Sequence, residues 1–303
     1  MNIIETDRLT RRFRATEAVH ELTLAVPEGS IFALLGSNGA GKTTTLKMLV
    51  NLLLPTAGSA RVLGVDSRRL SELELAQIGY VSEGQKPPEW MTVAQFLDYC
   101  RPFYPTWDRE LERKLLTRFE LPANRKLQQL SRGMLMKAAL LVSLAYRPKL
   151  LVLDEPFSGL DPVVREDLTA GLLETARQGE TTVLVSSHDI EEVERLADHV
   201  ALLEAGRLRL VETTEALLAR FRRVEVELHG VPSQGGMPNS WLGWRHEGSR
   251  AVFVESSFQA GRTERDCRER FPEATVLAHP MTLREIFISL ARSGRSQAKE
   301  HSS

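Results

Sequence analysis

Gly36-Ser37-Asn38-Gly39-Ala40-Gly41-Lys42-Thr43 is the stretch of this sequence that decides the fold. It matches the pattern G-x-x-x-x-G-K-[ST] at every fixed position and follows the continuous apolar run Ile31–Leu35. A helix is expected next, from about Gly41 to Leu54, and Pro55-Thr56-Ala57-Gly58 ends it. A glycine-rich loop between a buried strand and a helix turns main-chain N–H groups toward an anion. The stretch therefore predicts a cradle for phosphate groups.

The side chains at the end of the cradle add the chemistry that a nucleoside triphosphate requires. Lys42 places a point charge on the β- and γ-phosphates, and the hydroxyl of Thr43 can bind Mg²⁺. A chance glycine turn is the competing interpretation, but the strand before the loop and the helix after it disfavour that. We therefore predict a P-loop NTPase whose nucleotide contacts are Gly36, Ser37, Asn38, Gly39, Ala40, Gly41, Lys42, Thr43 and Thr44.

Two acidic residues follow the apolar run Leu150–Leu153, which predicts another buried strand. Ligands bind outside the carboxyl ends of parallel strands, so Asp154 can hold Mg²⁺ and Glu155 can orient and deprotonate the attacking water. Alone, the two acids could simply cap a strand; beside a phosphate cradle they favour hydrolysis. His188 follows the predicted strand Thr182–Ser186 and could sense the γ-phosphate, although a histidine in this position is more often structural.

Strand and helix patterns alternate along the first 220 residues, which favours a parallel sheet covered by helices. Residues 3–26 alternate as short strands do, and 77–82 predicts one more strand. Between 92 and 146 apolar residues recur at helical spacing. We expect an α/β P-loop NTPase with a mostly parallel core sheet, an N-terminal antiparallel β subdomain and a helical subdomain at about 88–146.

The composition changes after about Arg220, which predicts a domain of residues 1–220 followed by a small α+β extension, 221–293. Strands are expected at 224–228, 251–255 and 274–278, with a loop rich in glycine, proline and serine at 230–240 and a helix from near Thr282. The last residues, 294–303, are polar and are expected to be disordered.

Bulk properties exclude several classes of protein. The net charge of −1 gives no general attraction to nucleic acid, so no nucleic-acid partner is expected. The two cysteines stand far apart and favour reduced thiols in a cytoplasmic protein. No apolar stretch approaches the ~20 residues that cross a bilayer, and the first residues lack a signal-peptide core. If the chain works in transport, another subunit must form the pathway.

Five features occur in the order seen in the ATP-binding subunits of ABC transporters, which residues 1–220 resemble. They are the cradle, Leu130-Ser131-Arg132-Gly133-Met134, the strand ending in Asp154-Glu155-Pro156, Ser158-Gly159-Leu160-Asp161, and His188. The resemblance implies that two such domains enclose two ATP molecules, with Ser131 and Gly133 of one completing the γ-phosphate site of the other. It also implies that Asp161 couples the two sites and that His188 responds to the γ-phosphate. Phe13 occupies the place of an aromatic residue that stacks on adenine, and a core phenylalanine remains the alternative there.

Two departures from the family pattern concern the site. The family signature usually reads LSGGQ, and Arg132 and Met134 replace a glycine and the glutamine here. A glutamine that touches Mg²⁺ is usual near residue 83; the alignment puts Glu83 in its place, and Gln85 is the other candidate. Since Mg²⁺ prefers oxygen ligands, Glu83 is expected beside Thr43 and Asp154 as a metal ligand.

The resemblance implies an ATPase, dependent on ATP and Mg²⁺, that powers translocation through a separate transmembrane permease. Residues 99–108 and the C-terminal region resemble multidrug and antibiotic exporters, which favours export. The chain would then lie on the inner face of the membrane, bound to the permease, as a homodimer or as a heterodimer with a related subunit. A non-transport ABC ATPase that acts on ribosomes or nucleic acid is the alternative. The single cradle and the absence of a long coiled-coil insertion do not support it.

Overall fold

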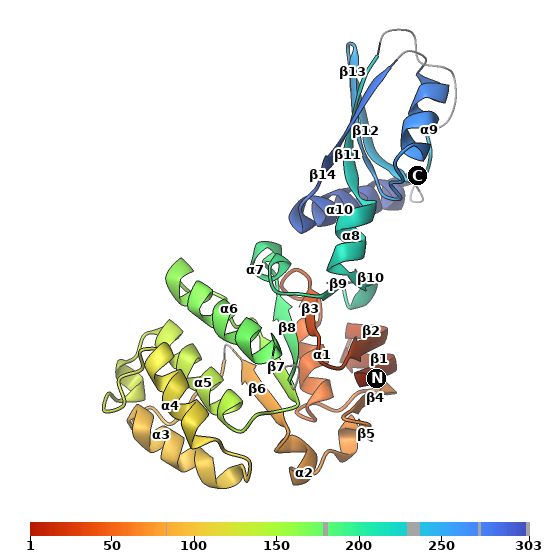
Figure 1. Cartoon of the computed structure of the whole chain (residues 1–303). Coiled ribbons are helices and arrows are strands. Elements are labelled where there is room, and N and C mark those ends of the chain that lie inside the picture. The colour runs from red at the N-terminus through yellow and green to blue at the C-terminus, as the bar shows by residue number, and fades with distance from the viewer. Residues whose placement is uncertain (83, 178–180, 229–236, 272–273, 301–303) are drawn as a thin grey trace. The chain divides into compact units, whose positions relative to one another are not determined.

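The computed structural model describes residues 1–82, 84–177, 181–228, 237–271 and 274–300 of the 303-residue chain (Figure 1). It divides into two compact units, Met1–Val211 and Glu212–Ser303. The composition placed this boundary at residue 220, whereas the structure places it at 211. The reason is that α8 (Thr214–Arg220) contacts α10 (Leu283–Glu300) and so belongs to the second unit.

The first unit begins with an antiparallel sheet, as the sequence predicted. β1 (Asn2–Phe13) pairs with both β2 (Thr16–Pro27) and β4 (Ala57–Val62), and β5 (Val65–Asp66) lies beside β4. Side chains that alternate along these strands, such as Leu22, Leu24 and Val26, are buried in the core of the unit. This alternation between buried and exposed positions is the period-two pattern from which the strands were predicted.

A mostly parallel sheet forms the centre of the first unit. Its order is β10-β9-β3-β8-β7-β6, with the bounds β3 (Ile31–Leu35), β6 (Ile78–Ser82), β7 (Leu150–Asp154), β8 (Thr182–Ser187), β9 (His199–Glu204) and β10 (Arg207–Thr213). The neighbours β6–β7, β7–β8, β8–β3 and β3–β9 pair in parallel. Every residue of β3, β7 and β8 is buried, which explains the apolar runs 31–35, 150–153 and 183–185 within them. The order brings the carboxyl ends of β3, β8 and β7 side by side.

Helices connect the parallel strands. α1 (Lys42–Leu49) contacts β7 as well as β4, α2 (Glu72–Leu75) contacts β6, and both α6 (Pro162–Arg177) and α7 (Ile190–Glu194) contact β8. α1 ends five residues before the expected Leu54. Asn51 adopts a left-handed conformation (φ 59°), in which a helix stops and which asparagine tolerates better than most residues.

Between β6 and β7 the chain forms the predicted helical subdomain, α3 (Val93–Cys100), α4 (Arg109–Arg118) and α5 (Arg132–Ala145). Each helix begins at a residue that caps its N-terminus. Thr92 forms a capping box with Gln95, Asp108 accepts two main-chain N–H groups, and Ser131 accepts the N–H of Met134. Polar residues ahead of apolar helical patterns therefore set where these helices start.

The second unit is an antiparallel sheet of order β12-β13-β11-β14 with helices α8, α9 and α10. β11 (Arg222–Glu227), β13 (Arg250–Glu255) and β14 (Thr275–Pro280) lie where the sequence predicted strands, while β12 (Trp241–Glu247) was not predicted. A register shift at Gly243 (φ 62°) interrupts the alternation of β12 and hides it from pattern analysis. The same shift puts Trp241 and Trp244 on one face of the sheet. Trp241 stacks on Phe253 and Phe271, and Trp244 stacks on Phe271 and lies tilted against Phe253, in a core that includes Cys267 of α9 (Arg262–Arg270).

The C-terminal segment differs from its prediction. Residues 294–300, expected to be disordered, continue α10 as helix, and 301–303 lie outside the described residues. Leu283, Ile286 and Phe287 are buried and anchor the first turns of α10. Because a helix that has started extends at low cost, the polar residues that follow these turns continue it. None of the helices in the described part of the chain is long and apolar enough to cross a bilayer.

Candidate active site

The glycine-rich loop joins β3 to α1. Two of its positions are so crowded that only glycine fits there. Gly41 has φ 103°, and a Cβ there would lie 2.4 Å from the carbonyl oxygen of Ala18. A Cβ on Gly36 would lie 2.3 Å from the carbonyl oxygen of Leu203. The tip of the loop, 37–39, is exposed, and Thr44 is half-buried. The loop therefore presents main chain to the outside at the N-terminus of α1.

Lys42 folds back over the loop. Its Nζ donates to the carbonyl oxygens of Gly36 (2.6 Å) and Ser37 (3.2 Å) and lies 3.0 Å from Oε1 of Glu155. The side chain is only 5% exposed, so the ammonium group is held by these three acceptors inside a protected site. A cation at the centre of a ring of main-chain groups is suited to an anionic ligand.

Glu155 connects the loop to His188. Its Oε2 lies 2.7 Å from Nδ1 of His188, and the side chain is 14% exposed. Because an ionised carboxylate only accepts hydrogen bonds, Nδ1 is assigned as the donor in this pair. Lys42, Glu155 and His188 come from α1 and from the ends of β7 and β8, and the sheet order brings these three side chains together.

The backbone of Glu155 is strained. Its φ of 53° lies in the left-handed region, which costs a residue with a side chain about 1–2 kcal/mol. The main-chain N–H of Glu155 donates to Oγ of Ser186 at 3.0 Å, which holds this conformation. Strain of this kind concentrates at functional sites, where it aims a side chain that a regular strand would point elsewhere.

Ser186 is a site residue that sequence reasoning missed. It is fully buried, and its Oγ donates to Oδ1 of Asp154 at 2.8 Å while it accepts the N–H of Glu155. The parallel pairing of β7 with β8 puts Ser186 directly beside Asp154. The signal in the sequence was a hydroxyl at the end of a buried strand, two residues before His188, but only the register shows which acid it meets.

Thr43 and Asp154 bring two oxygen atoms together, as a magnesium site requires. Thr43 Oγ1 donates to Asp154 Oδ1 at 3.0 Å. Adjacent ligands of an octahedral Mg²⁺ with bonds of 2.0–2.1 Å are about 2.9 Å apart, so this separation fits the ion. Glu83, the third predicted ligand, lies outside the described residues. The described residues contain no group of three or more histidine, cysteine, aspartate or glutamate side chains that could hold a metal, so a bound ion would also need phosphate or water oxygens.

Ser131 and Gly133 lie at the start of α5, and Asp161 lies at the start of α6. Ser131 Oγ accepts the N–H of Met134 (3.2 Å) at the N-terminus of α5, and Asp161 Oδ1 accepts the N–H of Val164 (3.0 Å) at α6. A Cβ on Gly133 would lie 2.9 Å from Cγ1 of Val164, so glycine lets these two helix ends approach closely. The role of Ser131 and Gly133 toward a second copy stays a prediction.

Phe13 is not a core residue, which removes the alternative left open by the sequence. The side chain is 42% exposed at the end of the β1–β2 hairpin, and the Arg11 guanidinium carbon lies 4.5 Å from its ring centroid. Its contact with adenine remains a prediction.

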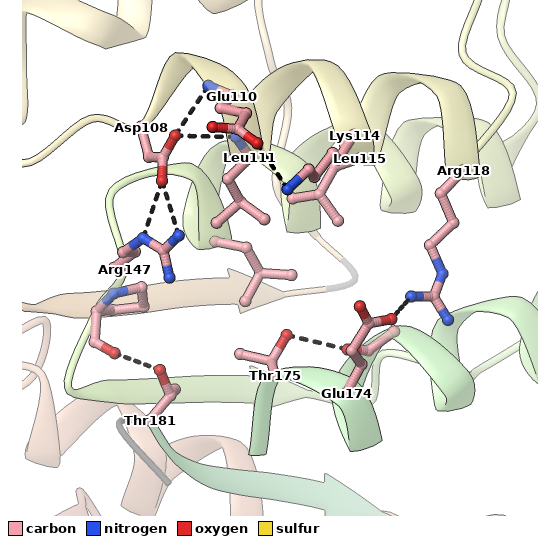
Figure 2. A pocket seen from close by; sticks show the side chains of 13 residues that line it. Asp108, Glu110, Leu111, Lys114, Leu115, Arg118, Arg147, Glu174, Thr175 and Thr181 are labelled. Carbon is pink, nitrogen blue, oxygen red and sulfur yellow. Dashed lines mark hydrogen bonds and ion pairs between the residues drawn. The ribbon is translucent and has the colours of Figure 1, made fainter. Parts of the chain in front are cut away.

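A separate cavity of about 400 Å³ lies between α4 and α6 and contains none of the predicted site residues. Figure 2 shows that its charged side chains pair with one another: Arg147 with Asp108, Lys114 with Glu110, and Arg118 with Glu174. Since three cations meet three anions, the cavity offers no excess charge to a nucleotide. The chemistry therefore concentrates at the carboxyl ends of β3, β7 and β8.

Comparison with known proteins places these features in a family. Residues 19–158 match the family model described as ABC transporter. The chain is 34% identical over 232 residues to the uncharacterized ABC transporter ATP-binding protein YhaQ of Bacillus subtilis (strain 168), covering 75% of this chain and 76% of that protein. It is 29% identical to the Nod factor export ATP-binding protein I of Neorhizobium galegae, covering 98% and 86%.

Similarity to solved structures points to the same family. One described as an ATP-binding subunit of an ABC transporter is 28% identical, with a TM-score of 0.66, and covers 72% of this chain and 92% of that one. The part of this chain outside that match, roughly a quarter, leaves room for the second unit, which the likeness to the Nod factor export protein includes.

Proposed function

This chain belongs to the ATP-binding proteins of ABC transporters, and from that premise we propose that it drives a separate membrane-spanning permease by closing and reopening a dimer around MgATP. As a member of this family, the chain binds and hydrolyses ATP. The observation that carries the proposal is the convergence of Lys42, Glu155 and His188 at the end of the glycine-rich loop.

In the first step the phosphates compete with Glu155 for Lys42. Main-chain N–H groups of residues 36–43 and the Lys42 ammonium bind the triphosphate, so the 3.0 Å contact between Lys42 Nζ and Glu155 Oε1 weakens. ATP binding thereby releases one oxygen of the carboxylate at the time when a base is needed. The other oxygen stays with His188 at 2.7 Å, which keeps the side chain oriented.

In the second step Glu155 orients the attacking water and accepts its proton at Oε1. His188 Nδ1 donates to Oε2, which keeps the side chain oriented while Oε1 takes up the proton and the group becomes a neutral carboxylic acid. The contact of His188 with Glu155 would report whether the γ-phosphate is present. Thr43 and Asp154 would hold Mg²⁺, which would neutralise part of the negative charge of the triphosphate. Ser186 keeps both acids in place through its two hydrogen bonds.

Dimer closure would use the start of α5. Ser131 and Gly133 stand at a helix N-terminus, where main-chain N–H groups and the helix dipole favour an anion. ATP favours the closed dimer only through contacts that ADP cannot make, and contacts to the γ-phosphate are of that kind. Asp161, at the cap of α6, would transmit closure from one site to the other.

The permease is proposed as a separate chain, since no described helix crosses a bilayer. Export as the direction is supported by the named role of the Nod factor export protein. To test this, the tagged chain is expressed in its own cells, membranes are solubilised in mild detergent, and co-purifying proteins are identified by mass spectrometry. We expect a polytopic membrane protein, with ATPase activity that changes when it is bound. Recovery with ribosomes and no membrane protein would instead support the non-transport alternative.

A further inference from the structure

Arg11 and Phe13 lie two residues apart on β1, and their side chains stack. The guanidinium carbon of Arg11 lies 4.5 Å from the centroid of the Phe13 ring, close enough for a cation–π contact. Arg11 is half-buried and its Nε is shielded from solvent, whereas Phe13 is 42% exposed. The guanidinium therefore covers the inner side of the ring and leaves the outer side open.

A hydrogen bond to the main chain fixes the position of Arg11. Its Nη1 donates to the carbonyl oxygen of Leu54 at 2.8 Å, in the segment that follows α1. A second hydrogen bond, from the main-chain N–H of Arg12 to Oγ1 of Thr56 (3.1 Å), ties β1 to the same segment. The Nε of Arg11 has no hydrogen-bond partner among the described residues. The side chain is thus held by one hydrogen bond and by its stack on Phe13.

The pair of side chains stands beside the glycine-rich loop. Arg11 lies opposite Val19 in the ladder between β1 and β2. Val19 in turn lies against the loop, because a Cβ on Gly41 would come within 3.2 Å of Cγ2 of Val19. The ladder thus reaches the start of α1, and the hydrogen bond to Leu54 reaches the segment after its end. Arg11 therefore connects Phe13 to both ends of the helix that follows the loop.

We propose that Arg11 is a positioning residue for the nucleobase of ATP, which it serves by holding the ring of Phe13. The guanidinium supports the inner side of the ring, so the outer side is presented to adenine in a fixed place beside the loop. An aromatic side chain at the end of a hairpin would otherwise sample several rotamers, and holding it lowers the cost of ordering the stack when ATP binds. This role rests on the proposed function, since it requires that ATP binds at the loop and that Phe13 contacts its base.

The strength of the cation–π contact sets the size of the effect. At a partly exposed site such a contact shifts an equilibrium by about two- to five-fold, and losing the order of the ring can weaken ATP binding by no more than that. In the described part of the chain, the polar contacts of Arg11 include neither Lys42 nor Glu155. The maximal rate of hydrolysis should therefore be independent of Arg11, and only the affinity for ATP should change.

Arg11→Met tests this role, because methionine keeps an unbranched apolar stem but removes the guanidinium. Arg12→Met is the matched control: it removes the same charge from the next residue, whose guanidinium pairs with Glu17 at 2.9 Å. MgATP and inorganic tripolyphosphate with magnesium, which supplies phosphates without a base, are titrated calorimetrically into each full-length variant. We expect Arg11→Met to bind ATP about two- to five-fold more weakly than the control and tripolyphosphate equally well. Its KM for ATP should rise by the same factor while kcat stays unchanged.

Phe13→Ala completes the test as the second member of a double-mutant cycle. Without a ring to hold, adding Arg11→Met should weaken ATP binding no further, and a further loss in the double variant would contradict the proposal. Equal weakening of ATP and tripolyphosphate by Arg11→Met would overturn it, because Arg11 would then act only through its charge on the phosphates. Unchanged ATP binding by Arg11→Met or by Phe13→Ala would also sink it, while retained tripolyphosphate binding would leave the cradle intact. If the unaltered chain bound neither ligand, the proposed function would fall together with this role.

Discussion

Replacing Glu155 with glutamine separates the charge of the proposed catalytic carboxylate from its shape. Glutamine retains an oxygen that can accept from Lys42 Nζ and fits the same space, but it cannot accept a proton from water. We expect the maximal rate of ATP hydrolysis to fall by about 10²–10⁴-fold, the usual contribution of a positioned base. That corresponds to about 3–5 kcal/mol of transition-state stabilisation.

The same substitution should strengthen ATP binding. Glu155 competes with the phosphates for Lys42, and both side chains are largely buried, so solvent does not screen the contact. Changing a charged acceptor into a neutral one weakens such a hydrogen bond by about 1 kcal/mol, which predicts about five-fold higher ATP affinity. A fall in turnover accompanied by tighter binding distinguishes this geometry from a general loss of the site. The ATP-bound dimer should also accumulate.

The assay combines phosphate release at saturating MgATP with calorimetric titration of ATP. Glu174→Gln is the matched control, because it makes the same chemical change in the cavity of Figure 2, away from the loop. That variant should retain its turnover and its affinity. Near-normal hydrolysis by Glu155→Gln would refute the role assigned to the carboxylate. Weaker ATP binding would show that Glu155 does not compete for Lys42.

The other predictions concern binding, positioning and packing. Lys42→Ala should lose most ATP affinity in calorimetry, and unchanged binding would remove the cradle from the mechanism. Ser186→Ala removes the hydrogen bond to the Asp154 carboxylate, so turnover should fall about ten- to hundred-fold with ATP affinity retained; equal turnover would mean that Ser186 positions nothing. Gly133→Ala forces a Cβ against Val164 and should lower the free energy of unfolding by about 1–3 kcal/mol, measured by denaturant titration. Adding Val164→Ala should restore stability, and no rescue would contradict the proposed clash.

Arg132, one of the departures from the family signature, contacts the segment Ser158-Gly159 within the same chain. One of its terminal nitrogens donates to the carbonyl oxygen of Ser158 at 3.3 Å, and the guanidinium packs where a Cβ on Gly159 would clash. Arg132 therefore connects the start of α5 to the loop before Asp161. Nothing in the structure explains Met134.

Local patterns in the sequence determined most of the fold of the first unit. The buried strands, the helix starts and the cradle depend on residue type and short-range spacing. Apolar runs form strands that are buried on both faces, and capping residues begin helices. Glycines allow the crowded turns at residues 36 and 41. For the same reason Lys42, Asp154, Glu155 and His188 could be selected in advance. Each stands at the end of a recognisable strand or loop.

Tertiary structure alone decided which side chains meet. Ser186 faces Asp154 because two strands separated by a helix pair in one particular register, and no local pattern encodes that register. β12 escaped prediction because its bulge breaks the alternation, and the helical residues 294–300 depend on the packing of the preceding turns. The left-handed Glu155 is likewise held by a hydrogen bond from a neighbouring strand. Short-range chemistry selects the elements and their candidate residues, whereas contacts between distant segments fix the geometry in which those residues react.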